Sequence, residues 1–78
     1  MNVEPLRAVL SEIRPEFDFG ESKDFISDGM LDSFDMVLLV SALDRKFGIS
    51  IDGREIVPNN FCSFEAMASL LQKHGVRL

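Results

Sequence analysis

Hydrophobic residues recur at helical spacing in three stretches of the chain, and each stretch predicts a helix. The first covers residues 3–14 and is stopped by Pro15, whose ring cannot continue a helix. Pro5 is compatible with the first turn of that helix. Its apolar stripe consists of Val3, Leu6, Leu10 and Ile13, with Val9 beside them.

The second predicted helix runs from Ser33 to Phe47, and Gly48 is well placed as its left-handed cap. One apolar stripe of this helix is expected to face the core: Met36, Leu39, Val40, Leu43 and Phe47. The last predicted helix is capped by Ser63 and ends at Gly75. Its inward stripe consists of Phe64, Met67, Leu70, Leu71 and His74.

Between these two helices the sequence predicts a turn at Asp52-Gly53 and a short helical segment over residues 58–61. A chain of 78 residues is long enough for one core, so residues 1–78 are predicted to form a single domain. Three main helices with a short additional one predict an all-α bundle.

Residues 15–32 form a long connection between the first two helices. Gly20 and Gly29 interrupt any regular element there, yet the segment is rich in large apolar side chains. These are Phe17, Phe19, Phe25, Ile26 and Leu31. A polar linker would not contain three phenylalanines, so we expect this loop to pack over the core.

The composition is that of a globular protein, with 46% hydrophobic and 27% charged residues. The single cysteine, Cys62, cannot form an internal disulfide, which suits a reducing compartment, and we interpret it as a small packed residue. No apolar run approaches the roughly 18 residues that span a bilayer, and the first ten residues lack an apolar signal segment. We therefore expect a cytoplasmic protein that does not insert into membranes.

The net charge of −5 is concentrated in one segment. Residues 16–35 contain seven acidic residues and a single lysine, whereas the rest of the chain carries a net charge of +1. Such a field repels nucleic acid and favours basic protein partners, with association that weakens in salt. The alternative is a solvated acidic loop without a partner.

Ser33 lies between two aspartates, and the sequence offers no means of making it a catalytic nucleophile. Its surroundings lack the Gly-x-Ser-x-Gly pattern of a nucleophile elbow, and the only histidine, His74, ends the last helix. Negative neighbours also disfavour an alkoxide. A structural role is possible instead: Asp32 or Ser33 can cap the second helix, and Asp35 complements its dipole.

Calcium binding is a second hypothesis for the acidic segment. Counted from Asp24, the residues Asp28, Gly29 and Asp32 fall at positions typical of an EF-hand loop. Ile26 removes an oxygen ligand, however, and Asp35 replaces the usual bidentate glutamate. A plain helical interaction module is a third alternative.

The second helix carries another apolar stripe, opposite its core stripe. Phe34, Val37 and Leu38 lie on that side, and Ser41 and Arg45 continue it. A helix in a small bundle cannot bury both stripes, so we predict an exposed apolar patch that docks a partner. The alternative is that loop 15–32 covers the patch.

The tripeptide Asp32-Ser33-Phe34, which opens a helix after Asp28-Gly29-Met30-Leu31, resembles the Asp-Ser-Leu motif of acyl and peptidyl carrier proteins. The resemblance extends over nearly the whole chain in length, acidity, long first loop and short third helix. It implies a four-helix acyl-carrier-like bundle that is a monomer and not itself an enzyme. It also implies that a phosphopantetheinyl transferase attaches 4′-phosphopantetheine, taken from coenzyme A, to Ser33, beside Asp32.

The same resemblance implies what the arm does. Its thiol carries acyl or aminoacyl groups as thioesters from an activating ligase to a downstream acyltransferase or synthase. The partner-docking residues implied on the second helix are Phe34, Asp35, Val37, Leu38, Ser41, Asp44 and Arg45.

Two features depart from the fatty-acid type of carrier. The positions that match two acidic residues of its second helix are here Leu38 and Arg45, although Asp35 and Asp44 remain. Residues 55–61 are similar to D-alanyl and aminoacyl carriers and to stand-alone carriers. The resemblance therefore implies a stand-alone carrier of that type more than a housekeeping carrier of fatty-acid synthesis.

Overall fold

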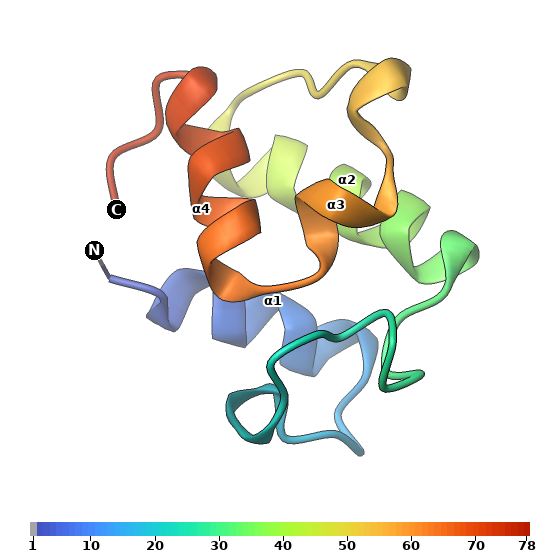
Figure 1. Cartoon of the computed structure of the whole chain (residues 1–78). Helices are drawn as coiled ribbons and strands as arrows, with labels where there is room; N and C mark the ends of the chain where they lie inside the picture. The colour runs from blue at the N-terminus through green and yellow to red at the C-terminus, as the bar shows by residue number, and fades with distance from the viewer. Residues whose placement is uncertain (1) are drawn as a thin grey trace.

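The computed structural model describes residues 2–78, and within that range the secondary structure is entirely helical (Figure 1). The α-helices are α1 (Glu4–Ile13), α2 (Ser33–Phe47), α3 (Pro58–Phe61) and α4 (Phe64–Lys73), and the short 3-10 helices are η1 (Phe19–Glu21) and η2 (Gly53–Glu55). The predicted all-α class, with three main helices and a short one, is thereby confirmed.

Helix α1 begins with a proline in its first turn and ends one residue before Arg14, whose backbone N–H still donates to the carbonyl of Leu10. The side chains of Leu6, Val9 and Leu10 are buried. These residues recur every three or four positions, so the apolar stripe places one face of the helix on the core.

Helix α2 has the predicted bounds, and both of its caps are local. The Asp32 carboxylate accepts from the backbone N–H of Asp35, and the Asp35 carboxylate accepts from the backbone N–H of Asp32, which forms a capping box. At the other end Gly48 adopts φ 65°, a left-handed conformation that favours glycine. These caps satisfy backbone groups that a helix end would otherwise leave unpaired.

Helix α4 is capped as predicted, because the Ser63 hydroxyl accepts from the backbone N–H of Ala66 at 3.0 Å. The short helix α3 precedes it and packs against it. The chain turns away after His74 at Gly75, which has φ 84°.

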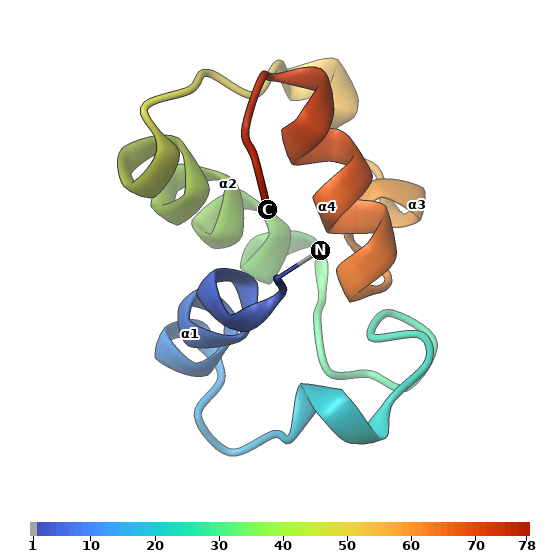
Figure 2. The same cartoon turned by 90° about the vertical axis from the view of Figure 1, so that its left-hand side faces the viewer.

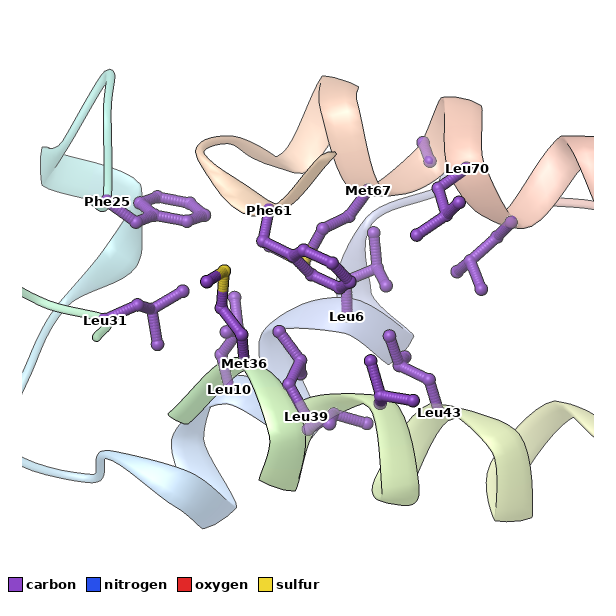
Figure 3. Packing of buried hydrophobic residues seen from close by; sticks show 14 of the residues in the cluster. Leu6, Leu10, Phe25, Leu31, Met36, Leu39, Leu43, Phe61, Met67 and Leu70 are labelled. Atoms are coloured by element: carbon purple, nitrogen blue, oxygen red, sulfur yellow. The ribbon is translucent and has the colours of Figure 1, made fainter. Parts of the chain in front are cut away.

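The core lies between α1, α2 and the α3–α4 pair, and Figure 3 shows their side chains converging there. Fully buried leucines come from α1, α2 and α4, while α3 contributes Phe61. The predicted core stripe of α2 is confirmed, with four of its members buried and Phe47 half-buried at the helix end.

The loop over residues 14–32 closes one end of the bundle, at the bottom of Figure 2. Phe19 and Phe25 are buried and meet edge-to-face with ring centroids 5.0 Å apart, and Phe25 meets Phe64 of α4 in the same way at 5.2 Å. The backbone N–H of Phe25 donates to the carbonyl of Cys62 at 2.7 Å. The prediction that this loop packs over the core is confirmed.

The two ends of the described chain meet on one face of the molecule (Figure 2). The backbone N–H of Asn2 donates to the carbonyl of Leu78 at 2.8 Å. Among residues 2–78, no helix has both the length and the apolar character needed to cross a bilayer.

Candidate functional site

Ser33 is the first residue of α2, and its side chain is exposed. The loop that delivers the chain to this point is anchored one residue before the cap, since Leu31 is buried in the core. The capping box then defines the direction in which the helix starts. Ser33 therefore sits on an ordered helix end, where free backbone N–H groups and the positive end of the helix dipole favour an anion.

Asp35 faces inward beneath this helix end, with only 3% of its surface exposed. One of its oxygens, Oδ2, accepts from the backbone N–H of Asp32 at 3.1 Å and from Nε of Arg14 at 3.0 Å. Nη2 of Arg14 lies 3.0 Å from the same oxygen. The prediction that Asp35 docks a partner is wrong, because a buried carboxylate in an ion pair cannot reach one.

Arg14 connects the end of α1 to both aspartates that flank Ser33. Its Nη2 lies 3.7 Å from Oδ2 of Asp32, and its Nη1 donates to Glu16 at 3.3 Å. Sequence reasoning missed this residue, because nothing local to Arg14 indicates a partner 21 positions later. The isolated charge of an arginine at the end of an amphipathic helix is ordinarily solvated.

The protonation of these groups follows from their contacts. The backbone N–H of Asp35 lowers the pKa of the Asp32 carboxyl, and the charge of Arg14 lowers it further. The hydrogen bond and charge of Asp35 raise the pKa of the Arg14 guanidinium. At neutral pH the exposed hydroxyl of Ser33 is therefore next to an ionised carboxylate that an arginine partly neutralises.

His74 does not serve Ser33 as a base. Its Nε2 lies 3.0 Å from Oε1 of Glu55, which joins the end of α4 to η2. The contacts next to Ser33 are those of a capping box and an ion pair.

The outer face of α2 exposes the apolar side chains that the sequence placed there. Phe34, Val37 and Leu38 are 70%, 55% and 42% exposed. The loop over residues 14–32 packs against the core and α4 and leaves this patch open, so the alternative that it covers the patch is wrong. We call Phe34, Val37 and Leu38 the α2 patch.

Ser41 and Arg45 continue the exposed face of α2 beyond the α2 patch. Arg45 and Lys46 also line an open groove of about 320 Å³ between α1 and α2, with Val9 and Ala42 among its other lining residues. The exposed face is consequently apolar and acidic near Ser33 and basic near the end of the helix.

Asp44 has a structural partner that sequence analysis did not foresee. Its side chain is half-buried, and its Oδ1 accepts from the backbone N–H of Ile51 at 3.0 Å. Its backbone carbonyl accepts from Ile49 at 3.2 Å. Asp44 thus holds the chain that leaves α2, and its docking role stays a prediction.

The acidic segment does not assemble as an EF-hand loop. The Asp24 carboxylate accepts from the backbone N–H groups of Ile26 and Ser27, the Asp28 carboxylate accepts from the Ser22 hydroxyl, and Asp32 caps α2. Across residues 2–78, no three side chains of metal-ligating type converge. These local contacts give the calcium hypothesis no support.

Cys62 is half-buried at the junction of α3 and α4, with its Sγ 3.7 Å from the carbonyl oxygen of Asn59. This placement agrees with its interpretation as a packed residue.

Comparison of the chain with protein families, with curated proteins and with solved structures finds no match.

Proposed function

We propose that this chain is a carrier protein of the cytoplasm, with a four-helix acyl-carrier-like bundle, whose Ser33 hydroxyl receives 4′-phosphopantetheine from coenzyme A. The observation that carries the proposal is the combination at one helix end. An exposed serine opens a rigidly capped helix, and an exposed apolar patch lies directly beside it on the same helix.

The attachment requires little of the carrier itself. Oγ of Ser33 forms a bond to the phosphorus that bears the pantetheine chain of coenzyme A. The bond from that phosphorus to the bridging oxygen breaks, adenosine 3′,5′-bisphosphate leaves, and the hydroxyl proton passes to the transferase. Because the transferase supplies the base, Ser33 needs exposure and orientation rather than activation.

The residues at the start of α2 fit a phosphodiester on Ser33. The N-terminal N–H groups and dipole of a 15-residue helix favour an anion there. The ionised Asp32 opposes it, and Arg14, 3.7 Å from that carboxylate, offsets part of the repulsion. When attached, the arm supplies a terminal thiol that carries acyl or aminoacyl groups as thioesters.

The α2 patch would be the surface that partner enzymes contact. A contiguous group of exposed apolar side chains beside a modification site favours docking, because its burial stabilises a complex. The acidic residues around Ser33 would orient basic partners toward the serine, and Arg45 at the far end would disfavour a uniformly basic partner face. A phosphopantetheinyl transferase, an activating ligase and a downstream acyltransferase or synthase are the proposed partners.

The charge pattern of α2 supports a carrier of the D-alanyl or aminoacyl type over the fatty-acid type. Leu38 is an exposed apolar residue and Arg45 an exposed cation on the docking side. Both stand where the fatty-acid type carries acids, so an enzyme that recognises an acidic helix would lose two attractive contacts.

Intact-mass spectrometry tests the proposal. The purified chain is incubated with coenzyme A, Mg²⁺ and a phosphopantetheinyl transferase of broad specificity. We expect one phosphopantetheine to be added to the wild type and none to Ser33→Ala. Ser69→Ala is the matched control, because it removes another exposed serine, on α4 and outside the docking residues, and it should be modified like the wild type. A wild type that stays unmodified would overturn the proposal.

A further inference from the structure

We infer that Arg14 is a positioning residue for the modification of Ser33, acting through the buried carboxylate of Asp35. This inference rests on the proposed function and deepens it, since it identifies a residue outside α2 and its docking face. The guanidinium lies at the end of α1, and the two nitrogens that contact Asp35 meet one oxygen of that carboxylate.

The geometry shows how an effect passes from Arg14 to Ser33. Oδ2 of Asp35 receives Arg14 on one side and the backbone N–H of Asp32 on the other. Asp32 directly precedes Ser33, and its own carboxylate accepts from the backbone N–H of Asp35. Arg14 is therefore linked through two hydrogen bonds to the backbone of Asp32, the N-cap residue that directly precedes Ser33.

Burial makes the ion pair necessary. Asp35 is 3% exposed, and a buried carboxylate without a counter-charge draws in water or moves outward. If Arg14 is removed, an outward movement of Asp35 breaks the hydrogen bond to the Asp32 backbone and with it half of the capping box. The first turn of α2 then frays, and the Ser33 hydroxyl loses its defined orientation.

Charge adds to this effect. The side chain of Arg14 remains 35% exposed while it contacts Asp35, and it lies within 4 Å of Asp32 as well. This one guanidinium contacts both aspartates that flank Ser33. A phosphodiester that arrives at Ser33 adds a negative charge to this group, so the guanidinium also lowers the electrostatic cost of modification.

The experiment measures the modification of Arg14→Gln by the transferase, with Arg7→Gln as the matched control. Arg7 lies on the same helix and contacts other elements, because it stacks on Phe64 at 5.1 Å and reaches Asp18 at 4.0 Å. Its loss destabilises the fold without touching the start of α2. We expect Arg14→Gln to lower kcat for phosphopantetheine transfer about 10- to 100-fold, with a KM for the carrier close to that of the wild type.

A second readout does not depend on the transferase. In the unmodified protein, hydrogen exchange of the Asp32 amide should be faster in Arg14→Gln than in the wild type. It should be unchanged in Arg7→Gln, because Arg14 and not Arg7 holds the Asp35 carboxylate that accepts from this amide. Arg14→Lys keeps the positive charge but loses the planar guanidinium whose two nitrogens contact Asp35. It should therefore give intermediate values of both kcat and the hydrogen-exchange rate of the Asp32 amide. This variant also serves if Arg14→Gln does not fold.

A double-mutant cycle tests whether Arg14 acts through Asp35. Asp35→Asn should lower kcat in the same direction, and adding Arg14→Gln to it should have little further effect. Additive losses would overturn the inference, as would wild-type kcat and exchange in a folded Arg14→Gln, or an equal loss in Arg7→Gln. If the wild type itself were not modified, the proposed function would fail, and that result is distinguishable from the others.

Discussion

Val37 and Leu39 lie two positions apart on α2 and occupy opposite sides of it, since Val37 is 55% exposed and Leu39 is fully buried. An advance of two residues along an α-helix rotates the side-chain direction by about 200°. Residues two positions apart can therefore lie on opposite faces, one packed in the core and the other exposed to solvent. Leu39 belongs to the core shared with α1 and α4, whereas Val37 belongs to the α2 patch beside Ser33.

Alanine at these two positions should separate stability from partner binding. Leu39→Ala should lower the free energy of unfolding by about 2–5 kcal/mol, because it opens a cavity in the core. Val37→Ala should change it by no more than about 0.5 kcal/mol. Urea denaturation of both variants measures these values, and equal destabilisation would show that the patch is packed.

Variants of the α2 patch should impair recognition by enzymes although they leave the fold stable. In the phosphopantetheine-bearing form, Val37→Ala or Leu38→Ala should reduce kcat/KM for loading by the cognate ligase, because an apolar contact is lost from the interface. Ser69→Ala is the control, since it shortens an exposed side chain on α4, outside the docking residues of α2. Unaltered loading of both apolar variants would argue against docking at this face.

Salt should raise the stability of the fold. The seven acidic residues of segment 16–35 repel one another. Arg7 of α1 and Arg14, which follows α1, contact Asp18 and Glu16 and compensate part of this repulsion. Raising ionic strength from about 0.01 M to about 0.15 M screens this repulsion, so the Tm should increase. The increase should be larger in Arg14→Gln, and a Tm that falls with salt in the wild type would contradict the prediction.

Glycine should be required at position 48 but not at position 53. Gly48 has φ 65°, so Gly48→Ala should destabilise the protein by about 1–2 kcal/mol, the cost of placing an L-residue in the left-handed region. Gly53 has no positive φ and open space around its Cβ position. Gly53→Ala should therefore be neutral, or stabilise the protein by up to about 1 kcal/mol, because alanine lowers the conformational entropy of the unfolded chain. Thermal denaturation of the pair makes the comparison.

The contacts of the Glu55 carboxylate with the Asp52 backbone and with His74 should make stability depend on pH. The backbone N–H of Asp52 lowers the pKa of Glu55 below its ordinary value of 4.5, and His74 adds to this effect. The stabilisation is full above the ordinary pKa and is lost as the pH falls through the lower, folded value. The Tm advantage of the wild type over Glu55→Gln should thus shrink from about pH 5 to about pH 3, and a constant difference would rule out this contribution.

Helix bounds, caps and the two faces of α2 could all be predicted from the sequence, because they depend on neighbours within one or two turns. The spacing of Met36, Leu39, Val40 and Leu43 requires one buried face in any bundle. Gly48 ends α2, and Ser63 begins α4, through contacts with their own backbone. The exposure of Ser33 at the start of α2 follows from the same local pattern.

The roles of the charged residues were decided by the tertiary structure. Asp35 was expected on the surface because acids usually are, but the crossing of α1 over the start of α2 brings Arg14 to it and permits burial. Asp44 similarly holds Ile51 after the chain has turned back. The side of the bundle that loop 14–32 covers was also undecided, since it depends on where Phe25 meets Phe64. Periodicity shows which side chains must be buried, whereas the partner of a buried charge depends on how separate segments are placed in space.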